Sequence, residues 1–62
     1  MAIATEISER LRAARVAHDH TQEEAARAMG VTVGAVSRWE RGQRAPTGLC
    51  RKAVERYIAM KP

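Results

Sequence analysis

The chain has 62 residues, of which 45% are hydrophobic and 3% aromatic, and its net charge is +4. This length supports one small domain, so we expect residues 1–62 to form a single unit with a modest core. The single cysteine excludes an internal disulfide, and no apolar run reaches the roughly 20 residues that span a membrane. No basic segment followed by an apolar one opens the chain, so we predict no signal peptide and a cytoplasmic location.

The positive charge lies in the second half of the chain. Residues 1–31 contain four arginines and five acidic residues, for a net charge of −1. Residues 32–62 contain seven basic and two acidic residues, for a net charge of +5. Such an asymmetry is typical of a surface that faces phosphates, although a solvated basic face would give the same composition.

The first predicted helix covers Thr5–Ala17 and follows a short arm at Met1–Ala4. Apolar residues recur along this segment at steps of four, four and three, which is the spacing of one helix face. These residues are Ile3, Ile7, Leu11 and Ala14. We therefore expect one side of this helix to pack on the rest of the domain.

The next segment, His18-Asp19-His20, could bind a metal or form a polar loop. Two histidines separated by one residue are too few ligands for a structural zinc site, and the only cysteine is 30 residues away. We therefore interpret the segment as a polar connection and predict no metal site.

A second helix is predicted over Gln22–Met29. Thr21 precedes it and Glu24 follows three residues later, which is the pattern of a capping box. Gly30 then provides a residue that can adopt the left-handed conformation that ends a helix. Val31 is expected to be buried at the turn.

A third helix is predicted over Val33–Arg41, with Thr32 as its N-cap and Gly42 after its end. Val33, Val36 and Trp39 recur at steps of three, so we expect them to share one face. Base stacking is a second possible role for the tryptophan, but its spacing favours the core.

A fourth helix is predicted over Gly48–Met60, with Thr47 as its N-cap, and a short fifth helix could form within residues 43–48. The fourth helix has a wide expected inner face, which consists of Leu49, Ala53, Tyr57 and Met60, with Val54 and Ile58 beside them. The excess apolar surface could pack on the first helix or form a dimer interface. Cys50 is expected to be a small packing residue, because no base is placed to activate it.

Residues 21–42, TQEEAARAMGVTVGAVSRWERG, resemble the helix-turn-helix of the lambda-repressor-like (XRE) family of DNA-binding proteins. The matching features are the Thr-Gln start, the small Ala26, Gly30 in the turn, the Ser-Arg-Trp-Glu run and Gly42. The resemblance implies an all-α, four- to five-helix domain with the helix-turn-helix at residues 21–42.

The resemblance also implies a role for individual residues. Those expected to contact DNA bases are Thr32, Val33, Gly34, Ser37 and Arg38. Those expected to contact DNA phosphates are Gln22, Arg41, Gln43 and Arg44, the last two being simply solvated turn residues in the alternative interpretation. Arg15 and Glu40 are expected to form an ion pair between the first and third helices, the alternative being a solvent-exposed arginine.

Arg38 is the favoured base contact, because a guanidinium can donate two hydrogen bonds to guanine. Val33, if exposed, could contact a thymine methyl group. Gly34 departs from the family, which usually has a side chain at this position. The missing side chain removes one base contact and increases the expected dependence of binding on DNA shape.

The predicted function is sequence-specific binding of double-stranded DNA by a small phage or bacterial repressor. We expect a homodimer at a two-fold operator, without a cofactor, metal, membrane or small-molecule ligand. The alternative is a fold used for protein–protein interaction, or an antitoxin or controller that works with another protein. An enzyme is not predicted, because the sequence has no nucleophile–base pair and no phosphate loop.

Overall fold

The computed structural model describes residues 3–61 and contains four helices. They are α1 (Ile3–Ala17), α2 (Gln22–Met29), α3 (Val33–Glu40) and α4 (Gly48–Ala59). The described residues contain no strand, so the predicted all-α class is confirmed. None of these helices is long and apolar enough to cross a membrane.

The ends of α2 follow directly from its sequence. Thr21 Oγ1 accepts the Glu24 backbone N–H at 3.1 Å, and Glu24 Oε1 accepts the Thr21 N–H at 2.8 Å, which completes the predicted capping box. Gly30 ends the helix with φ 74°, a left-handed conformation that costs glycine little. These two local signals bring the chain into α3 through a short turn.

A single side-chain cap begins α3. Thr32 Oγ1 accepts the Ala35 N–H at 3.1 Å, as predicted for an N-cap. The helix ends at Glu40, one residue earlier than predicted, and Arg41 is its C-cap. The chain then reverses through Gly42, which has φ 73°.

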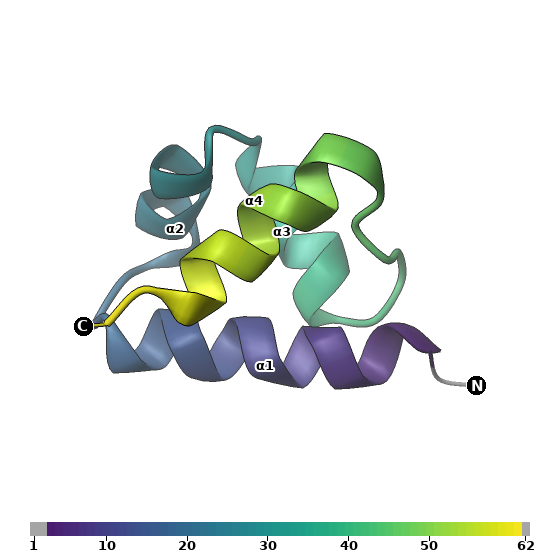
Figure 1. Cartoon of the computed structure of the whole chain (residues 1–62), viewed down its shortest axis with the longest axis horizontal. Helices are drawn as coiled ribbons and strands as arrows, with labels where there is room; N and C mark the ends of the chain where they lie inside the picture. Colours follow the sequence, from purple (N-terminus) through teal and green to yellow (C-terminus); the bar gives the residue numbers. More distant parts are fainter. Residues whose placement is uncertain (1–2, 62) are drawn as a thin grey trace.

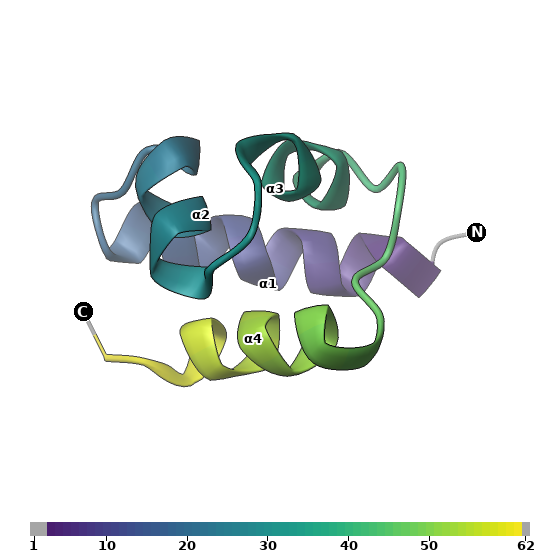
Figure 2. The same ribbon diagram turned by 90° about the horizontal axis from the view of Figure 1, so that it is seen from above.

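The longest helix, α1, lies along one side of the domain, and α3 and α4 pack against it (Figure 1). Viewed from above, α3 and α4 lie on opposite sides of α1, and α2 lies over its C-terminal half (Figure 2). The pairs in contact are α1 with α3 and α4, and α2 with α3 and α4. The helix-turn-helix pair α2–α3 is therefore supported from below by α1 and from the side by α4.

The core consists of small and aliphatic side chains around two aromatic ones. Its buried residues are Ile7, Leu11, Ala25, Ala26, Val36, Trp39, Val54 and Tyr57. Trp39 is only 5% exposed, which confirms its predicted place in the core. Val31 and Cys50 are half-buried against this cluster, so both are packing residues.

The prediction of which face of α4 packs on the core was wrong, because the helix is rotated about its axis relative to that expectation. Leu49 is 82% exposed, whereas the buried face is centred on Cys50, Val54 and Tyr57. Met60, also placed on the inner face, is exposed and lies just after the helix. Thr47 occupies the N-cap position, but its side chain makes no capping hydrogen bond.

Three further expectations need correction. Val33 is 42% exposed and does not join Val36 and Trp39 in the core. No fifth helix forms within residues 43–47, where the buried ring of Pro46 precedes α4. The first helix begins at Ile3 instead of Thr5, while Met1, Ala2 and the Ile3 side chain lie outside what the structure describes.

Candidate nucleic-acid interface

An ion pair connects the C-terminal end of α3 to α1. Arg15 Nε lies 2.6 Å from Glu40 Oε2, and Arg15 Nη2 donates to Glu40 Oε1 at 3.1 Å. The two side chains are 17% and 5% exposed. The pair expected between these helices is thus present, in the two-point geometry that suits a guanidinium and a carboxylate. Its hydrogen bond to the carboxylate raises the pKa of Arg15.

Two other groups belong to the same network. Arg15 Nη1 donates to the His20 carbonyl at 3.0 Å, which ties the α1–α2 connection to the pair. Gln22 Nε2 donates to Glu40 Oε1 at 3.1 Å, so the first residue of α2 is linked to the last residue of α3. Gln22 was expected to contact DNA; here its half-buried side chain already has a partner within the protein.

The five expected base contacts lie at the start and along the outer side of α3. Thr32 and Val33 are exposed, and Gly34 and Ser37 are half-buried. The Thr32 hydroxyl is engaged as the helix cap, so Val33 is the apolar group that remains accessible in this turn. Val33 was expected in the core but is exposed. An exposed Val33 is what a contact with a thymine methyl group requires.

Arg38 is exposed near the end of α3 and lines a hollow beside the helix. This hollow, about 400 Å³ in volume, is bounded by Ala35, Arg38, Trp39 and Arg44. Arg44 comes from the loop after α3, so the fold brings together an expected base contact and an expected phosphate contact. Two arginines at one hollow make it suitable for an anion.

The remaining expected phosphate contacts, Arg41 and Gln43, are also exposed. Arg41 Nε lies 3.4 Å from the Ser37 carbonyl, a long hydrogen bond that leaves the charge without a carboxylate. The two ion pairs among residues 3–61 are Arg15–Glu40 and Arg51–Glu55. Arg38, Arg41 and Arg44 belong to neither, so the end of α3 and the loop after it carry three arginines without a carboxylate partner.

One cluster was missed by the sequence reasoning. His20 Nδ1 and Tyr57 Oη form a 2.7 Å hydrogen bond, and the His18 ring stacks on the His20 ring with centroids 5.3 Å apart. Burial raises the pKa of the Tyr57 hydroxyl. The two histidines therefore pack on α4, whereas they were expected to be plain polar loop residues. No local sequence signal could have paired His20 with Tyr57, because the two are 37 positions apart.

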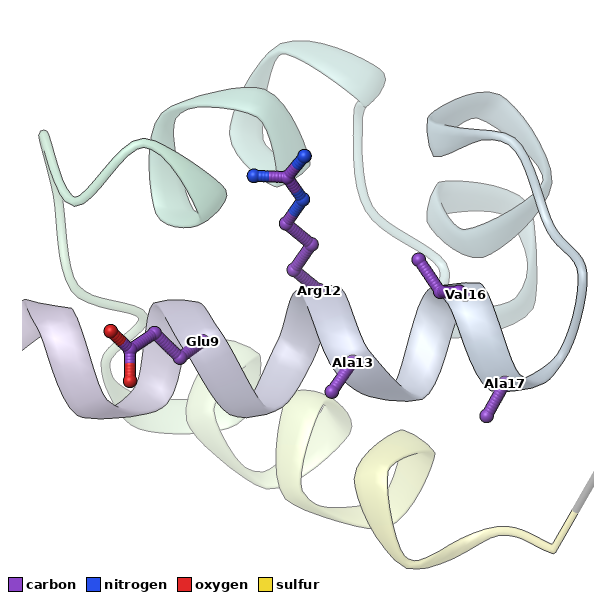
Figure 3. Close-up of a pocket in the computed structure, with 5 residues that line it drawn as sticks. All are labelled: Glu9, Arg12, Ala13, Val16 and Ala17. Atoms are coloured by element: carbon purple, nitrogen blue, oxygen red, sulfur yellow. The ribbon is translucent and has the colours of Figure 1, made fainter.

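The structure also contains a hollow of about 500 Å³ on the outer side of α1. Its lining residues are Glu9, Arg12, Ala13, Val16 and Ala17, all from this one helix (Figure 3). Within residues 3–61, no three His, Cys, Asp or Glu side chains are grouped as metal ligands. Neither hollow is lined by a cysteine, serine or histidine.

Comparison with known proteins gives one finding. A family model described as helix-turn-helix matches residues 11–49, which is more than half of the chain and includes all of α2 and α3. The searches of curated proteins and of solved structures gave no match. The matched segment begins within α1, so it also includes both partners of the Arg15–Glu40 pair. The chain belongs to the helix-turn-helix family of the lambda-repressor-like (XRE) type, a family of DNA-binding regulatory domains.

Proposed function

We propose that the protein binds double-stranded DNA at specific sequences and regulates transcription as a small repressor. The observation that carries this proposal is the row of unpaired arginines along α3 and the loop after it. Arg38, Arg41 and Arg44 are exposed and belong to no ion pair among the described residues. A basic surface on the second helix of a helix-turn-helix is suited to the major groove.

In this proposal affinity and specificity come from different residues. Gln22, Arg41, Gln43 and Arg44 contact phosphates, which fixes the register of the domain on the duplex but carries no sequence information. Arg38 contacts a guanine, while Thr32, Val33, Gly34 and Ser37 face neighbouring base edges. For Gln22 the N-terminus of α2 adds backbone N–H groups and the positive end of the helix dipole.

We further propose that two copies bind one operator. The longest dimension of the domain is 30 Å, and α3 offers one short helix to the groove. Two half-sites one DNA turn apart are separated by about 34 Å, so one copy cannot occupy both. A bound dimer would act by excluding RNA polymerase from the operator.

The test is selection from a random double-stranded DNA library at fixed salt, followed by sequencing of the bound fragments. We expect an inverted repeat with half-sites about one helical turn apart. A single asymmetric motif would contradict the dimer but not the specificity. If no sequence is enriched and binding disappears as salt rises, the surface is a non-specific polycation and the proposal is wrong.

The second candidate function is a protein-interaction module, in which the helix-turn-helix fold binds another protein. The observation in its favour is the hollow on the outer side of α1, where Ala13, Val16 and Ala17 are exposed. This surface shares no residue with the row of arginines on α3. A protein without measurable DNA affinity at low salt would favour this candidate over operator binding.

A further inference from the structure

The exposed side chain of Arg38 has a glycine neighbour on the outer side of α3. Four positions before it, one turn earlier on the helix surface, is Gly34, and four positions after it, beyond the end of α3 at Glu40, is Gly42. Neither has a side chain that could compete for space. Arg38 also belongs to neither ion pair of the described residues, so its position depends on packing and on nearby charge alone.

The guanidinium of Arg38 lies next to the position that a Cβ atom at residue 34 would take. A Cβ atom built on Gly34 would be 3.8 Å from Arg38 Nη2 and 3.9 Å from Arg38 Nη1. Long side chains on a helix lean toward its N-terminus and over the residue four positions earlier, which explains this direction. These are ordinary van der Waals distances, so a methyl group fits, whereas a longer side chain that extends in this direction would meet the guanidinium.

The other side of Arg38 is less favourable for its charge. There the hollow shared with Arg44 brings a second guanidinium to the same space, and Trp39 closes its wall. Two like charges repel, so in the absence of an anion Arg38 is favoured on the Gly34 side. In the proposed function Arg44 binds a phosphate and Arg38 contacts a base on the Gly34 side, so the two guanidinium groups have separate partners.

We propose that Gly34 determines the DNA specificity of this protein through Arg38. The glycine leaves the surface over the first turn of α3 to the guanidinium, so Arg38 contacts a guanine opposite that turn instead of one beside its own Cα. One arginine thereby covers the positions that two side chains would otherwise contact. This inference depends on the proposed function, since it concerns which base pair the bound protein recognises.

The experiment compares site selection and equilibrium binding for four proteins: wild type, Gly34→Ala, Gly34→Leu and Arg38→Ala. Gly34→Ala is the matched control, because its methyl group fits beside the guanidinium. We expect it to keep the wild-type motif. Gly34→Leu should displace the guanidinium and lower the preference for guanine at the affected position about tenfold, or move the guanine to the neighbouring base pair.

A double variant separates an effect through Arg38 from a direct clash with DNA. In the Arg38→Ala background, Gly34→Leu should cause no further change in base preference at the guanine position. Both leucine variants should fold, since they replace a helix glycine, and thermal unfolding checks this.

The outcomes distinguish this inference from the proposed function. If Gly34→Leu keeps the wild-type guanine preference in full, or changes it equally without Arg38, the inference is overturned while sequence-specific binding stands. If the wild type enriches no sequence, the proposed function fails first and the inference fails with it.

Discussion

The inner and outer sides of α3 differ in burial and in charge pairing, although the helix has only eight residues. On the inner side Val36 and Trp39 are buried, and Glu40 is held by Arg15 and Gln22. On the outer side Val33 and Arg38 are exposed, and Arg38 has no carboxylate partner among the described residues. The residues that stabilise the domain and the residues proposed to contact DNA thus lie on different sides of one helix, so each set can be changed separately.

The strongest test of the inner side is Trp39→Ala. Removing a buried tryptophan typically costs about 3–5 kcal/mol of unfolding free energy, which is much of the stability expected for a domain of this size. We expect chemical denaturation to show a largely unfolded variant. Leu49→Ala is the control, because an 82% exposed leucine should change stability by no more than about 0.5 kcal/mol.

The ion pair should give the next largest effect. Glu40→Gln leaves the largely buried Arg15 charge without its anion and should cost about 3 kcal/mol. The control is Glu55→Gln, which breaks the Arg51–Glu55 pair on the surface of α4. That pair has a similar distance of 2.7 Å, but its side chains are 48% and 51% exposed. It should therefore contribute less than about 0.5 kcal/mol, and equal losses would refute the role assigned to burial.

The outer side should respond in the opposite way. Arg38→Ala should leave the unfolding free energy unchanged within about 0.5 kcal/mol, yet weaken operator binding by about 1–3 kcal/mol and relax one base position. Arg44→Ala, as a phosphate contact, should weaken binding to all sequences and reduce the salt slope by about 0.9. A uniform loss for Arg38→Ala would identify that residue as a phosphate contact too.

A smaller effect is expected at the helix caps that place α2 against α3. Thr21→Ala removes the hydrogen bond to the Glu24 N–H and should cost about 1 kcal/mol. Thr47→Ala is its counterpart at α4, where the threonine makes no capping hydrogen bond, and should be nearly neutral. Thermal unfolding of both variants measures the difference, and similar losses at both caps would contradict it.

The smallest effect is a pH dependence from the same capping box. The hydrogen bond from the Thr21 backbone N–H lowers the pKa of Glu24. A carboxyl group whose pKa is lowered in the folded state stabilises the protein fully above its unfolded-state pKa, near pH 4.3, and this stabilisation is lost as the pH falls from there through the lower pKa of the folded state. Comparing the melting temperatures of wild type and Glu24→Gln between about pH 6 and pH 3 should show the difference shrinking in acid. A constant difference would exclude this origin.

Features with local causes were predicted well. The capping box of Thr21 and Glu24, the left-handed Gly30 and the N-cap Thr32 each depend on residues within four positions, and all are present in the structure. The inward position of Trp39 followed from its spacing after Val36. The Arg15–Glu40 pair came from family resemblance, because no local pattern links residues 25 positions apart.

The failures concern tertiary packing. On α4 the apolar residues cover a wide arc, so hydrophobicity alone could not decide whether Leu49 or Val54 faces the core; contact with α1 decides it. The His20–Tyr57 hydrogen bond has the same origin, since it depends on where α4 crosses the α1–α2 connection. The DNA contacts remain predictions, although the structure gathers Arg38 and Arg44 at one hollow.

The position of Trp39 has a practical consequence for spectroscopy. It is the protein's one tryptophan, it is buried against α1, and it forms part of the wall beside Arg38 and Arg44. Its fluorescence should therefore shift to longer wavelength when the domain unfolds and the indole meets water. An anion entering the hollow would instead change the emission intensity without that shift. The native chain thus carries a label-free signal that distinguishes occupied, free and unfolded molecules in one titration.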